Sequence, residues 1–184
     1  GWPLPVLARQ LLWINVMTDV LPALALSVDA ADTRVMARPP RKVGERIVPL
    51  ADGIVLVLLA VVMAAGTLFV FARAAFEVDL PYSQTMAFSA LVFFQMWNVL
   101  NVRSSGSVFQ RALFTNRLLW LAIVVSVILQ VVVVQVPVLQ PWFGTVGLSL
   151  KDWLFAGLIG ASVVIFGELV KFVRRMTMSA KADS

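Results

Sequence analysis

Five long, mainly apolar stretches follow one another along this chain and constrain its fold more than any other feature of the sequence. They cover about residues 7–28, 50–75, 85–102, 118–136 and 150–172. A helix needs about 20 consecutive apolar residues to cross the hydrocarbon core of a bilayer. The fourth stretch is rich in β-branched residues, but it is too long for a strand, because strands rarely exceed about 10 residues. We therefore predict an all-α membrane protein with five transmembrane helices.

The composition excludes several classes of protein. The chain is 60% hydrophobic and 14% charged, whereas a soluble domain has about 45–50% apolar and about 25% charged residues. It contains no cysteine and no histidine. A Ser/His or Cys/His nucleophile pair, a zinc site with the usual ligands and a haem held by His or Cys are therefore excluded. An ordinary soluble enzyme does not fit this composition, and a polytopic membrane protein does.

Basic residues are divided unequally between the two sides of the membrane that five spans would define. The loop over about 29–49, the loop after the third span and the C-terminal tail hold 12 of the 15 Lys and Arg residues, and the other three are Arg9, Arg73 and Lys151. Cytoplasmic segments carry the excess of Lys and Arg. We therefore predict an N-terminus outside and a cytoplasmic C-terminus. The net charge of +5 then reflects topology, so membrane lipid is the expected surrounding and no nucleic-acid partner is expected.

The first span contains a polar cluster. Asn15, Thr18 and Asp19 stand at i, i+3 and i+4, which places them on one face of an α-helix. An Asp at mid-bilayer costs at least about 2.5–3.5 kcal/mol, so it normally faces a cavity or a partner. Pro22 has no N–H for the carbonyl of Thr18. These oxygen ligands suit Ca²⁺, Mn²⁺ or Na⁺, and the alternative is that they only form hydrogen bonds between helices.

Polar residues elsewhere are more typical of helix packing. The third span carries Gln95, Asn98 and Asn101 at steps of three, near its cytoplasmic end. In the fifth span, Glu168 precedes Lys171 by one turn and predicts an ion pair at the helix end. The second and fourth spans have no acid in their interiors and are predicted to be scaffold. Three glycines of the fifth span suit close approach of a neighbouring helix: Gly157, Gly160 and Gly167.

The polar cluster belongs to a longer segment, 10–26, with the sequence QLLWINVMTDVLPALAL. This segment resembles the sixth transmembrane helix of the type II P-type cation ATPases, above all the calcium pumps of the sarcoplasmic reticulum and secretory pathway and their bacterial relatives. Residues 94–104 resemble the eighth helix of these pumps, and residues 167–172 resemble the end of the tenth. The resemblance covers the whole chain, 1–184, as helices six to ten.

The resemblance implies roles for particular residues. Asn15, Thr18 and Asp19 occupy the positions that bind transported cations in the calcium pumps, and Asn15 and Asp19 would serve the site shared by calcium and manganese pumps. Gln95 stands where two-site pumps have a Glu, so it and Asn98 belong either to an incomplete second site or to helix packing. We predict one ion per cycle, with Ca²⁺ first and Mn²⁺ or Na⁺ as alternatives.

The loop over about 29–49 resembles the cytoplasmic segment that touches the phosphorylation domain of these pumps. The resemblance assigns this coupling role to Asp29, Asp32, Arg38, Pro39, Pro40 and Arg41. Nothing in the chain resembles the phosphorylation motif, the nucleotide-binding domain or the actuator. Binding of Mg-ATP and its hydrolysis are therefore expected in the N-terminal remainder of a larger pump in a bacterial plasma membrane, and no catalytic residue is expected in this chain. The alternative is a non-catalytic five-span scaffold or subunit.

Overall fold

The computed structural model describes residues 3–28, 49–103 and 116–182, and these ranges contain helices and turns but no strand. The helices are α1 (Ala8–Ile14), the π-helix η1 (Asn15–Val20), α2 (Leu21–Ser27), α3 (Leu50–Glu77), α4 (Leu80–Arg103), α5 (Arg117–Gln135), α6 (Gln140–Phe143) and α7 (Leu150–Ala182). Five stretches are long and apolar enough to cross a membrane: Ala8–Ser27, Asp52–Phe76, Leu80–Val102, Arg117–Gln135 and Leu150–Val173. The prediction of an all-α chain with five spans is confirmed.

The third span begins earlier than residue 85, where the sequence places its start. Helix α4 begins at Leu80, and Pro81 lies in its first turn. Proline is tolerated there because the first N–H groups of a helix have no partner within the helix. The carboxylate of Asp79 accepts a hydrogen bond from the backbone N–H of Tyr82 at 3.0 Å, which satisfies another of these groups. The turn between the second and third spans is therefore very short.

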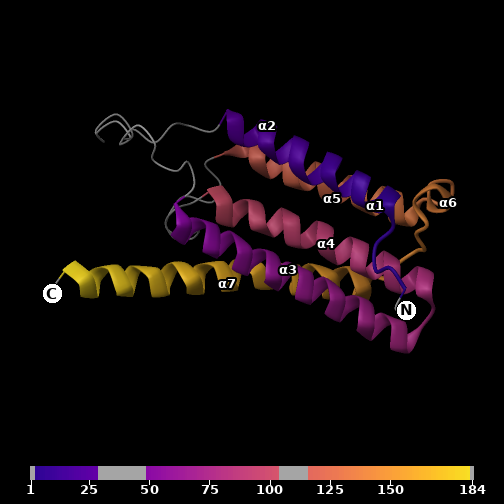
Figure 1. The fold of residues 1–184 in the computed structure, drawn as a ribbon. Coiled ribbons are helices and arrows are strands. Elements are labelled where there is room, and N and C mark those ends of the chain that lie inside the picture. The colour runs from indigo at the N-terminus through magenta and orange to yellow at the C-terminus, as the bar shows by residue number, and fades with distance from the viewer. Residues whose placement is uncertain (1–2, 29–48, 104–115, 183–184) are drawn as a thin grey trace.

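Helix α4 is the central helix of the fold. In its membrane-crossing part 61% of the residues are buried, against 28–33% in the other four spans. It packs against α3 and α7, and it also contacts α5 and η1, while α2 packs against α5. Figure 1 shows these two groups, with α1 and α2 running beside α5, and with α3, α4 and α7 side by side. The first span therefore lies at the edge of the bundle, supported from one side.

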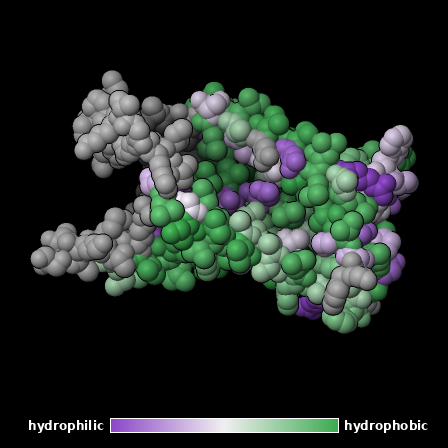
Figure 2. Space-filling view, viewed as in Figure 1, coloured by the Kyte–Doolittle hydropathy of each residue, from purple (hydrophilic) through white to green (hydrophobic). Residues whose placement is uncertain are grey.

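The outer surface of the helices is apolar. Leu158 and Ile165 of α7 are each 73% exposed, and α3 and α5 carry similar exposed side chains. In Figure 2 most of the visible surface is hydrophobic, and hydrophilic side chains gather toward the end that carries α6, with a smaller group in the middle of the molecule. A large apolar surface would be an aggregation hazard in water. In a bilayer it faces lipid, and the backbone groups behind it are satisfied within the helices.

Glycines bring α7 close to α4. A Cβ atom at Gly160 would lie 2.7 Å from Phe93 Cβ, and one at Gly167 would lie 2.5 Å from Asn101 Oδ1. A Cβ at Gly157 would meet nothing within 4 Å. The prediction of close helix approach is therefore confirmed for Gly160 and Gly167, whereas Gly157 faces open space.

This difference predicts opposite effects of the same substitution. Gly160→Ala should destabilise the protein by about 1–3 kcal/mol, because overpacking forces the two helices apart. Gly157→Ala is the matched control and should be neutral or stabilising by up to about 1 kcal/mol, because glycine is a poor residue for a helix interior. Thermal unfolding of the purified protein in detergent measures both. Equal unfolding temperatures for the two variants would contradict the close contact at Gly160.

Candidate cation-binding site

The candidate cation ligands all lie in η1, a π-helical stretch between α1 and α2. In a π-helix the N–H of residue i+5 bonds to the carbonyl of residue i, and such stretches inside α-helices are frequent at functional sites. The residues on either side, Ile14 and Leu21, keep right-handed helical dihedral angles. The first span therefore continues through this stretch with one widened turn, and it is not interrupted.

The widened turn corrects the prediction of a shared face for Asn15 and Thr18. That prediction assumed α-helical spacing, which the structure does not have at these residues. Asn15 is exposed, whereas Thr18 is only 4% exposed, and the side chain of Asp19 lies outside the described part of the chain. The hydroxyl of Thr18 donates a hydrogen bond to the carbonyl of Ile14 at 2.8 Å, which fixes the rotamer of this side chain.

Pro22 lies just after η1, in the first turn of α2, and has no N–H to donate to a carbonyl of the preceding turn. At α-helical spacing this would be the carbonyl of Thr18, as the sequence suggests. The hydroxyl of Ser126, in α5, donates a hydrogen bond to the neighbouring carbonyl of Met17 at 3.2 Å. A side chain from another span thus supplies a hydrogen bond to the π-helical turn that precedes the proline.

A second polar connection joins the first span to α5 and α4. The indole N–H of Trp13 donates to Oε1 of Gln130 at 3.0 Å, and Nε2 of Gln130 lies 3.5 Å from Oγ of Ser89. Gln130 is 1% exposed and Ser89 is fully buried. This chain of three side chains crosses the apolar interior just before η1 begins.

Sequence reasoning treated the fourth span as scaffold and missed Ser126 and Gln130. A signal was present, because these two are isolated polar residues in an apolar run and stand four positions apart. That spacing puts both on one face of α5. Their partners, Trp13 and Met17, are also four positions apart. The two hydrogen bonds therefore join the first span to α5 at points about one helical turn apart on each.

Both ends of the first span are tied to other elements. Gln10 is fully buried, accepts a hydrogen bond from the N–H of Leu7 at 2.9 Å and donates one to the carbonyl of Phe143 in α6 at 3.2 Å. At the other end, the amide of Asn116 donates to the carbonyl of Ala25 at 2.9 Å. The Asn116 side chain also accepts from the N–H of Leu119 and caps α5.

The polar stripe of the third span connects α4 to α7. Nδ2 of Asn101 donates to the carbonyl of Val163 at 3.0 Å and lies 3.5 Å from Oδ1 of Asn98. Lys171 donates to the carbonyl of Asn101 at 3.2 Å and pairs with Glu168 at 3.6 Å. The predicted ion pair in the fifth span is confirmed, and Asn101 serves helix packing.

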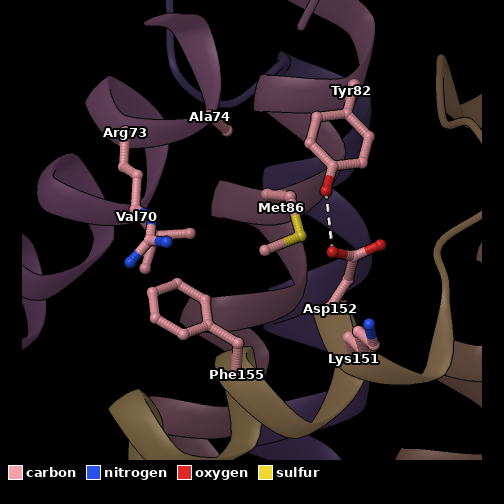
Figure 3. Close-up of a pocket in the computed structure, with 8 residues that line it drawn as sticks. All are labelled: Val70, Arg73, Ala74, Tyr82, Met86, Lys151, Asp152 and Phe155. Carbon is pink, nitrogen blue, oxygen red and sulfur yellow. Dashed lines mark hydrogen bonds between the residues drawn. The ribbon is translucent and has the colours of Figure 1, made fainter. Parts of the chain in front are cut away.

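The opposite end of the α4–α7 pair holds a polar pocket of about 180 Å³ between α3, α4 and α7. Figure 3 shows the hydroxyl of Tyr82 donating to Asp152 Oδ1, at 2.7 Å. The N–H and hydroxyl of Ser149 donate to the other carboxylate oxygen at 2.8 and 2.7 Å. The guanidinium of Arg73 lies 5.0 Å from the ring centre of Phe155. Asp152 thus fixes the first turn of α7 against α4, and we interpret this pocket as helix packing.

The remaining predicted site residues are placed as follows. Gln95 and Asn98 are half-buried in α4, which contacts η1. The six coupling residues between Asp29 and Arg41 lie outside the described residues. Within the described ranges no group of three or more His, Cys, Asp or Glu side chains is placed to hold a metal ion.

Comparison with known proteins gives a consistent result. The family described as "Cation transporting ATPase, C-terminus" matches residues 3–173. The chain is 37% identical over 184 residues to calcium-transporting ATPase type 2C member 2 of Rattus norvegicus, covering 98% of this chain and 20% of that protein. It is 39% identical over 179 residues to type 2C member 1 of Homo sapiens, covering 95% and 19%.

A bacterial relative is similar to a comparable degree. Calcium-transporting ATPase 1 of Bacillus cereus is 34% identical over 192 residues, covering 95% of this chain and 22% of that protein. The chain thus spans about a fifth of the length of these relatives. Together with the five spans, the match makes it an integral membrane protein.

Proposed function

Because this chain belongs to the family of cation-transporting ATPase C-terminal domains, we propose that it is the membrane part of an ATP-driven calcium pump. Its relatives named as calcium-transporting ATPases support Ca²⁺ as the transported ion. In this proposal the first span contributes Asn15, Thr18 and Asp19 to the ion site. The phosphorylation and nucleotide-binding domains belong to the rest of the pump, which binds Mg-ATP.

The observation that carries the proposal is the π-helical turn at the three candidate ligands. This π-helix widens one turn of an otherwise regular apolar span. The widened turn carries the residues whose side-chain and carbonyl oxygens would bind the ion. Ca²⁺ takes six to eight oxygen ligands, so these residues supply only part of the site. Asn15 is exposed, and this supports a site that further helices of the pump complete. Backbone carbonyls or water can provide the other ligands.

The proposal also includes one ion per cycle. Gln95 offers a neutral amide where two-site pumps have a carboxylate, and a neutral oxygen is a weaker ligand for a hard divalent cation. Mn²⁺ accepts similar ligands and is the main alternative to Ca²⁺, with Na⁺ less favoured. The loop with Asp29, Asp32 and 38–41 is proposed to transmit movement of the phosphorylation domain to the site.

Asp19→Asn in the full-length pump tests the ligand role. It should lower the apparent affinity for Ca²⁺ in phosphorylation by ATP by about tenfold or more, since loss of a charged ligand weakens binding by at least about 1.4 kcal/mol. Phosphorylation by inorganic phosphate without Ca²⁺ should persist, because the phosphorylation domain is unchanged. Asp52→Asn, in the first turn of α3, is the matched control and should behave like the wild type.

Two results would change the proposal. Wild-type affinity of Asp19→Asn for Ca²⁺, Mn²⁺ and Na⁺ would remove Asp19 from the site. Phosphorylation of the wild type that depends on Mn²⁺ or Na⁺ but not on Ca²⁺ would change the transported ion and leave the ligand role intact.

We further propose an N-terminus outside and a C-terminus in the cytoplasm of a bacterial cell, supported by the distribution of Lys and Arg. The segment has no cysteine, so single cysteines can report its topology. Val138→Cys, at a 75% exposed position after α5, should react with a membrane-impermeant maleimide in intact cells. Ser105→Cys should react only after the membrane is permeabilised, and the reverse pattern would invert the topology.

A further inference from the structure

We propose that Ser126 and Gln130 of α5 are positioning residues for the cation site, and that they hold the π-helical turn of the first span in its ligand-presenting geometry. This inference rests on the proposed function. The two residues act on the site through other groups, the carbonyl of Met17 and the indole of Trp13. They would make the fourth span part of the ion-binding machinery.

The π-helical turn needs support from outside the first span. Pro22, in the first turn of α2, has no N–H to donate to a carbonyl of this turn. A carbonyl without a donor is costly in the apolar interior between two spans. Ser126 is fully buried and donates a hydrogen bond to the carbonyl of Met17 at 3.2 Å.

Loss of the serine hydroxyl favours a different register. If the turn reverts to α-helical spacing, the N–H of Leu21 reaches the carbonyl of Met17. The change removes one residue from the turn, and one residue corresponds to a rotation of roughly 100° about the helix axis. Asn15, on one side of the turn, would then be rotated relative to α2 on the other side. The ligand geometry thus depends on a hydroxyl that is not itself a ligand.

Gln130 fixes the helix just before the turn. Its carboxamide accepts from the indole of Trp13 and lies within 3.5 Å of the hydroxyl of Ser89, so both of its ends have partners on other spans. Trp13 and Met17 bracket Asn15 in the sequence, and α5 contacts both. The rotation of the first span about its axis is therefore set by α5 on both sides of a proposed ligand.

The experiment uses the full-length pump and two substitutions, Ser126→Ala and Gln130→Leu. Each should lower the apparent affinity for Ca²⁺ in phosphorylation by ATP by about fivefold, as expected for the loss of one buried hydrogen bond. The maximal phosphoenzyme level and phosphorylation by inorganic phosphate should not change. Ser126→Thr keeps the hydroxyl and should restore affinity close to that of the wild type.

Two matched controls remove the same groups away from the first span. Ser162 bonds within α7 to the carbonyl of Ile159 at 2.6 Å, so Ser162→Ala should leave Ca²⁺ affinity unchanged. Gln135 of α5 donates to the carbonyl of Leu148 at 2.5 Å, so Gln135→Leu should also leave it unchanged. Thermal unfolding is measured for every variant, and Gln130→Met provides a second apolar replacement if Gln130→Leu does not accumulate.

The outcomes separate this inference from the proposed function. If Ser126→Ala and Gln130→Leu keep wild-type Ca²⁺ affinity while Asp19→Asn loses it, the positioning role is wrong and the calcium site stands. A lower unfolding temperature with unchanged affinity would assign the two residues to stability alone and overturn the inference. Equal losses of affinity in the two controls would also overturn it. If Asp19→Asn itself keeps wild-type affinity, the proposed function fails first.

Discussion

The fold of the first span depends on one requirement, that a backbone carbonyl inside a bilayer must find a donor within the protein. Pro22 removes one donor from the middle of the helix. The π-helical turn lies just before this proline, and the hydroxyl of Ser126 donates to the carbonyl of Met17 within the turn. In our proposal the buried serine of α5 and the proline of the first span are two parts of one arrangement that sets the register of the ligand-bearing turn.

The rest of the bundle holds this arrangement in place. Helix α4 packs tightly against α7 because glycines such as Gly160 allow the backbones to approach. It also carries Ser89, the last member of the chain of hydrogen bonds that begins at Trp13. Asn116 and Gln10 fix the two ends of the first span to α5 and α6. The first span is therefore held on one side by side-chain hydrogen bonds, while the exposed Asn15 remains accessible to further helices of the pump.

The apolar spans could be predicted from sequence because length and hydropathy alone decide whether a helix can cross a bilayer. The ion pair of Glu168 with Lys171 could also be predicted, because residues three positions apart on an α-helix are neighbours. The shared face of Asn15 and Thr18 was wrong because spacing rules assume an α-helix, whereas these two residues lie in a π-helical turn. That turn accepts a hydrogen bond from Ser126, 109 positions from Met17. A single sequence shows an isolated polar residue but not which carbonyl it meets.

Equilibrium binding of Ca²⁺ to the purified full-length pump, without ATP, tests the central claim most directly. The claim is that the π-helical turn at Asn15, Thr18 and Asp19 forms part of the transported-ion site. We predict one Ca²⁺ bound per pump molecule, with binding lost or greatly weakened in Asp19→Asn and retained in Asp52→Asn. Unchanged binding of Ca²⁺ by Asp19→Asn would contradict the account, because the bound ion would then have its ligands elsewhere in the protein.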